Sequence, residues 1–150
     1  MATTTLRGLA TRMEERAGKN YGGPGKKLKK LIGWRIVQNL VRATPVDTST
    51  ALSNWRITST HPLSSPRPPY FMGSYGSTRA ASASAVLNHA RHGIHWSPRN
   101  QPLKISNLVD YIVELEAGKS RQASAGWIHR SVRLGVSQGR ADFAAGRSVV

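Results

Sequence analysis

The stretch that decides the fold is residues 26–45, KKLKKLIGWRIVQNLVRATP. Apolar side chains recur in it at spacings of three and four residues, from Leu28 to Leu40, and basic residues fill the other face. This period predicts an amphipathic helix of about four turns. The helix should end at Thr44, because Pro45 disfavours the helical conformation in the residue before it.

The chain after this helix is predicted to form a turn, a strand and a loop. Residues 47–50 carry side chains that can bond the free amides of a tight turn. The alternation of polar and apolar residues around Trp55 and Ile57 predicts a half-buried strand. Four prolines among residues 61–69 predict an exposed loop over 61–73. Its role is left open between a docking arm or insertion and a peptide-recognition motif.

The second half of the chain is predicted to add a strand and three helices. A helix from about residue 78 should stop at Gly93, and residues 102–106 should form a short strand. Residues 107–118 fit a helix closed by its glycine, although part of this segment also alternates like a strand. A last amphipathic stripe begins at Trp127.

These elements predict one α+β domain, with a long basic helix and shorter helices packed on a small, mostly antiparallel sheet. A chain of 150 residues is the length of a single domain. We expect an N-terminal arm over residues 1–25 and the domain over 26–136. A flexible C-terminal tail is expected over 137–150, where Gly, Ala and Arg are frequent.

The composition is strongly basic. The chain has 22 Lys and Arg against 7 Asp and Glu, a formal net charge of +15. Such an excess is typical of proteins that meet a polyanion or an acidic protein surface. Four lysines around one helical turn form either a solvated face or a sequence-independent contact with DNA phosphates. These candidates for facing DNA are Lys26, Lys27, Lys29 and Lys30.

Several function classes find no support in the sequence. The absence of cysteine excludes disulfides, thiolate metal sites and cysteine nucleophiles. Neither a Gly-x-Ser-x-Gly elbow nor a phosphate-binding Gly-Lys-Ser/Thr loop occurs. His89, His92 and His95 are three residues apart, but Gly93 interrupts the helix that would align them as metal ligands. We therefore predict no enzymatic activity, no cofactor, no metal and no contact with a membrane.

Two segments carry a resemblance to a known family. The first, residues 44–55, reads TPVDTSTALSNW, and the second, residues 107–126, reads NLVDYIVELEAGKSRQASAG. Together they resemble the signatures of the tail-completion and neck (head–tail joining) proteins of tailed double-stranded DNA bacteriophages. This family includes the lambda tail-completion protein and its HK97-type relatives. Two positions depart from the signatures, since Ser49 stands where the family has Gly and Ser124 where it has Pro.

The matching residues look suited to setting the fold rather than to chemistry. Pro45 stops the helix, and Asp47 and Thr48 are expected to bond the amides of the turn that follows. Trp55 should contribute the largest burial of its strand, about 2–3 kcal/mol or more. The predicted fold-setting residues are Pro45, Asp47, Thr48, Trp55, Tyr111 and Gly118.

The second signature also gathers acidic residues in a basic chain. Glu116 lies near Lys119 and Arg121, so it forms either a solvated pair within the chain or a contact between subunits. In a ring, each subunit presents different patches to its two neighbours, so an acidic patch can meet a basic one. The predicted interface residues are Glu116, Lys119, Ser120, Gln122, Ala123 and Gly126.

The resemblance implies a virion structural protein that forms a ring at the phage neck and acts in tail completion and head–tail joining. The implied partners are further copies of the chain, for example in a hexamer, portal or adaptor and tail proteins, and packaged DNA as a non-specific contact. The protein would be made in the host cytoplasm and reside in the virion. The alternative is a sequence-independent nucleic-acid-binding protein of the small nucleoid or ribosome-associated type, expected as a monomer or dimer.

Overall fold

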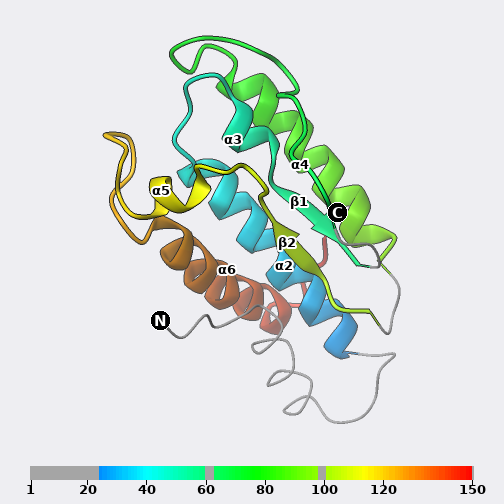
Figure 1. Cartoon of the computed structure of the whole chain (residues 1–150). Coiled ribbons are helices and arrows are strands. Elements are labelled where there is room, and N and C mark those ends of the chain that lie inside the picture. Colours follow the sequence, from blue (N-terminus) through cyan, green and yellow to red (C-terminus); the bar gives the residue numbers. More distant parts are fainter. Residues whose placement is uncertain (1–23, 60–62, 98–100, 150) are drawn as a thin grey trace.

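The computed structural model describes residues 24–59, 63–97 and 101–149, and the N-terminal arm predicted over 1–25 falls outside them except for its last two residues. The fold is α+β, as predicted, and long helices dominate it (Figure 1). The helices are α2 (Pro24–Ala43), α3 (Thr50–Ser53), α4 (Arg79–His95), α5 (Ile112–Glu116) and α6 (Trp127–Ala144), and the strands are β1 (Arg56–Thr58) and β2 (Lys104–Ser106).

Helix α2 lies at the centre and packs against both α4 and α6. Near its start, Lys30 Nζ donates to the carbonyl of His95 at the end of α4. Beyond its other end, Arg79 from the start of α4 donates to the carbonyl of Thr44. These contacts at opposite ends show that α4 runs antiparallel to α2. The predicted amphipathic helix is thus confirmed, but it begins at Pro24, inside the predicted arm, and its 20 residues exceed the predicted four turns. Its apolar face supplies the largest share of the core: Leu31, Ile32, Ile36, Val37, Leu40 and Val41 are all buried.

The contact between α2 and α6 depends on two glycines. A Cβ on Gly135 would lie 2.6 Å from Cα of Ile36, and one on Gly139 would lie 2.5 Å from Cα of Ile32. Residues four apart on a helix share a face, so the two glycines form one groove in which the backbone of α2 lies. Any larger side chain at these positions would force the two helices apart.

An ion pair with a buried carboxylate joins the same two helices. Arg35 Nε lies 2.5 Å from Oδ2 of Asp142, and Arg147 Nη1 lies 3.0 Å from Oδ1 of the same carboxylate. The hydrogen bond from Arg35 lowers the pKa of Asp142 despite its burial. The prediction of a flexible tail from residue 137 is therefore wrong for residues 137–144, which complete α6 and pack on α2.

The sheet consists of the antiparallel pair β1 and β2, with Ile57 opposite Ile105. Both strands lie where the sequence predicted them, with Trp55 just before β1. The predicted stop of α4 at Gly93 is wrong, because the helix continues to His95. At Gly93 a Cβ would lie 3.3 Å from the carbonyl oxygen of Ile57, so the glycine admits close packing of α4 on β1.

The helix predicted over residues 107–118 is present but shorter than expected. It spans Ile112–Glu116, and the alternative strand is wrong. The side chain of Asn107 accepts a hydrogen bond from the amide of Val109 and donates to the carbonyl of Ala51. These bonds hold a turn before α5 and tie it to α3.

Candidate functional site

The first signature folds into a hydrogen-bonded corner after α2. Trp55 Nε1 donates to Thr44 Oγ1 at 2.8 Å, and this hydroxyl donates to the carbonyl of Leu40 at 2.6 Å. Asp47 does not bond the amides of its own turn as predicted. Its Oδ1 accepts from the amide of Tyr75 at 2.7 Å, which fastens the turn before α4 to the signature. Thr48 Oγ1 pairs instead with the hydroxyl of Thr50 at 3.0 Å.

Ser49 adopts the left-handed conformation, with a φ of 67°, although it is not a glycine. It stands where the resembled signature has Gly, so the geometry expected of the glycine is present here with a serine. The residue is buried, and its Oγ lies 2.8 Å from Thr78 Oγ1. This hydrogen bond offsets part of the cost of the conformation, about 1–2 kcal/mol for a residue with a Cβ.

We expect Ser49→Ala to be less stable than Ser49→Gly. Both changes remove the hydroxyl, but only alanine keeps the Cβ that disfavours a positive φ. The alanine variant should unfold with a free energy about 1 kcal/mol lower than the glycine variant, as measured by urea denaturation. Equal stabilities would mean that residue 49 does not hold the left-handed conformation in solution.

The second signature forms the turn from α5 into α6. Gly118, with a φ of 89°, ends α5, and the amide of Lys119 donates back to the carbonyl of Glu114. This arrangement is the Schellman motif that a glycine favours after a helix. Gly126 also has a positive φ, 80°, and its amide donates to the carbonyl of Glu116 at 2.9 Å.

Glu116 caps the start of α6 within its own chain. Its Oε2 accepts from the amide of Ile128 at 2.7 Å, and its Oε1 lies 2.5 Å from Nδ1 of His129. A carboxylate at this end is stabilised by the helix dipole. Of the two roles considered for Glu116, the contact within the chain is therefore present, although its partners are the amides of α6 and His129 rather than Lys119.

The two signatures meet through Gln122. Its side-chain amide accepts from the backbone amide of Val46 at 2.9 Å and donates to the carbonyl of the same residue at 3.0 Å. Beside it, the rings of Trp55 and Trp127 pack edge to face, with centroids 6.2 Å apart. Trp127 Nε1 donates to the carbonyl of Leu115. We call this region the signature junction: Thr44, Val46, Trp55, Leu115, Gln122 and Trp127.

The remaining predicted interface residues surround this junction. Ser120 Oγ accepts from the amide of Gln122, Ala123 packs against the core, and Lys119 lies 3.5 Å from the exposed carboxylate of Glu114. Their role between subunits stays a prediction. The structure places two charged surfaces next to them, of which the sequence indicated only the acidic one.

The first surface is an acidic patch around α5. Val113 is 73% exposed beside Glu114, and Tyr111, which follows Asp110, is also exposed. Partial burial raises the pKa of the Tyr111 phenol. The patch comprises Asp110, Tyr111, Val113 and Glu114, and it combines negative charge with apolar area that no described residue covers.

The second surface is a pocket of 480 Å³, here called the arginine pocket. Two of its guanidinium groups are fixed by backbone carbonyls: Arg79 donates to Arg42, and Arg130 donates to Ala125. No acidic residue is among the described residues that line it, so its positive charge is not neutralised there. Its lining includes Arg42, Arg79, Gln122, Ala123, Arg130 and the half-exposed Leu134.

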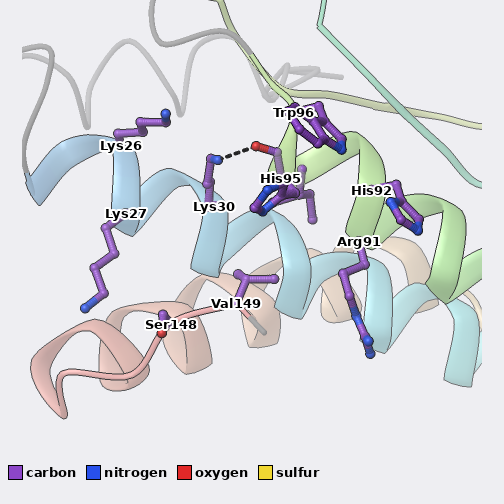
Figure 2. A pocket seen from close by; sticks show the side chains of 10 residues that line it. Lys26, Lys27, Lys30, Arg91, His92, His95, Trp96, Ser148 and Val149 are labelled. Atoms are coloured by element: carbon purple, nitrogen blue, oxygen red, sulfur yellow. Dashed lines mark hydrogen bonds between the residues drawn. The ribbon is translucent and has the colours of Figure 1, made fainter.

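A separate pocket of 490 Å³ lies at the other end of α2, where α4 and α6 end (Figure 2). We call it the basic pocket. Three of the four predicted lysines line it, and α4 adds basic and aromatic groups that the sequence did not associate with them. The lining comprises Lys26, Lys27, Lys30, Arg91, His92, Ile94, His95, Trp96, Ser148 and Val149.

Three of the four lysines also bond backbone carbonyls. Lys27 donates to Gly146 after α6, Lys29 to Gln101, and Lys30 to His95 of α4. Cations are favourable near helix C-termini, where carbonyls are unpaired. The lysine run thus has a structural role that the sequence did not reveal, namely to join the start of α2 to the ends of its two antiparallel neighbours.

Across residues 24–59, 63–97 and 101–149, no group of three or more His, Asp or Glu side chains is placed to hold a metal ion. His89 instead stacks on Tyr70, and His95 packs on Trp96. In the same part of the chain, no helix has the length and apolarity needed to cross a membrane.

Comparison with family models, with curated proteins and with solved structures finds no match to this chain.

Proposed function

We propose that this chain is a virion structural protein of the tail-completion or neck type, which forms a ring at the phage head–tail junction. The observation that carries the proposal is the signature junction. Gln122 of the second signature pairs with both backbone groups of Val46 in the first, so the two signatures form one folded module. The left-handed Ser49, at a position where the resembled signature has Gly, supports the same reading.

The surfaces beside the junction support assembly into a ring. The acidic patch on α5 and the arginine pocket share no residue and carry opposite charge. When the acidic patch of one copy docks in the arginine pocket of the next, each subunit uses two different surfaces. Such a heterologous contact closes into a ring when the rotation allows it. Portal or adaptor proteins and tail proteins would then stack on the two faces of the ring.

Charge-reversal variants can test whether the acidic patch pairs with the arginine pocket. Because like charges placed together in an interface cost several kcal/mol, Glu114→Lys or Arg42→Glu alone should convert rings to monomers. In an equimolar mixture the two variants can alternate, with native contacts and charge-exchanged contacts in turn, so the mixture should form assemblies larger than dimers. The double variant, which carries both changes in one chain, exchanges the charges and should recover rings. Native mass spectrometry measures all four samples.

Lys104→Glu is the matched control, because it reverses an exposed charge outside both surfaces. It should leave the ring intact. A double variant that stays monomeric would mean that these surfaces do not meet. A monomeric wild-type chain that shifts DNA would favour the nucleic-acid-binding alternative over the ring.

A further inference from the structure

We propose that the basic pocket binds single-stranded nucleic acid, with its lysines on the phosphates and an unpaired base stacked on Trp96. This function is distinct from ring formation, since the pocket shares no residue with the acidic patch or the arginine pocket. The arguments concern its charge, its exposed aromatic ring and its size.

The charge of the pocket is positive and is not balanced locally. No acidic residue is among the described residues that line it. Lys26 Nζ has no hydrogen-bond or ion-pair partner within the described part of the chain, and it lies in the first turn of α2, where the helix dipole also favours an anion. Burial, and after it the charges of Lys26 and Lys29, lower the pKa of Lys30. A phosphate placed here would relieve this repulsion.

Trp96 supplies a surface for a base. Trp96 is 76% exposed and lies just after the end of α4, at the rim of the pocket (Figure 2). The ring of His95 packs edge to face against it, with ring centroids 5.0 Å apart. Aromatic rings beside a positively charged groove stack with unpaired bases of any sequence. In a duplex the bases already stack on one another, so the ring favours a single strand.

The pocket also has a suitable size, and its lysines and indole contact features that every nucleotide shares. Its 490 Å³ falls within the usual range for small-ligand sites, about 300–1,000 Å³, and is open enough for one nucleotide with neighbouring phosphates on the lysines. Lysine acts on phosphate as a point charge and indole stacks on every base. Binding should therefore be independent of sequence and sensitive to salt.

Fluorescence anisotropy can test this with three probes: a labelled 15-residue oligothymidylate, an abasic strand of the same length and a duplex. We expect the wild-type protein to bind the oligothymidylate about 5- to 150-fold more tightly than the abasic strand. Trp96→Ala should abolish this difference. The pair Lys26→Gln and Lys27→Gln should reduce the slope of log affinity against log salt by about 1.4, at about 0.7 per phosphate contact.

The control pair is Arg121→Gln and Arg133→Gln, which removes the same charge from exposed positions outside the pocket. It should change the slope less than the lysine pair. Equal binding of the oligothymidylate and the abasic strand would overturn the proposal, as would tighter binding of the duplex. If the pocket variants instead changed the oligomeric state and left binding unaltered, the pocket would be a contact between subunits. Because ring formation is measured separately, either proposal can fail without the other.

Discussion

Replacing Trp55 by alanine should lower the free energy of unfolding by about 3–5 kcal/mol. The side chain is 8% exposed and lies at the centre of the signature junction. Its removal deletes the edge-to-face contact with Trp127 and the hydrogen bond to Thr44, and it leaves a cavity between α2, α3 and α6. The measurement is urea denaturation of both proteins, followed by circular dichroism.

Trp96→Ala is the matched control, because Trp96 is exposed and belongs to no buried cluster. It should change the free energy of unfolding by about 0.5 kcal/mol at most. Trp55→Phe keeps most of the volume but loses the indole N–H, so it should fall between the wild type and the alanine variant. If Trp55→Ala unfolded at the same urea concentration as the wild type, the signature junction would not be part of the core.

Gly135→Ala and Gly139→Ala should each destabilise the protein by about 1–3 kcal/mol. A loss of stability would be informative, because replacing glycine by alanine inside an exposed helix normally stabilises the helix by about 0.8–1.0 kcal/mol. Here the added Cβ atoms would lie 2.5–2.6 Å from the backbone of Ile32 and Ile36, and a backbone cannot rotate away as a side chain can. The double variant should separate α6 from α2. Thermal and urea denaturation both report this loss.

Ser137→Ala provides the comparison on the same helix. Ser137 is exposed between the two glycines, so alanine there should change stability by no more than about 0.5 kcal/mol. A stabilising effect of Gly139→Ala would mean that the close contact of α2 with α6 does not form in solution.

The sequence predicted those features of the fold that depend on residues close together in the chain. The period of residues 26–45 is local, and it correctly gave the position of α2 and its end before Pro45. Both strands and the glycine that ends α5 were also local patterns. By contrast, Gly93 suggested a helix stop, and Gly139 suggested a flexible tail. In both cases the glycine instead serves close packing against a distant segment.

The candidate sites show the same difference between local patterns and contacts made by the fold. The sequence identified Glu116 and Gln122 as notable, but their partners, the start of α6 and the backbone of Val46, are brought together only by the fold. The lysines near residue 26 were visible as a run of charge. Their association with Arg91 and Trp96 was not, because it depends on α4 lying antiparallel to α2.

The sequence by itself therefore determined the basic charge, the central amphipathic helix and the turns of the two signatures, since each depends on neighbouring residues or on a count. The tertiary structure alone decided that α6 extends to Ala144, that the two signatures join through Gln122, and that the arginine pocket and the basic pocket form. Each of these depends on residues about 50 to 120 positions apart, whose contacts require the antiparallel packing of the long helices and leave no periodic pattern in the chain.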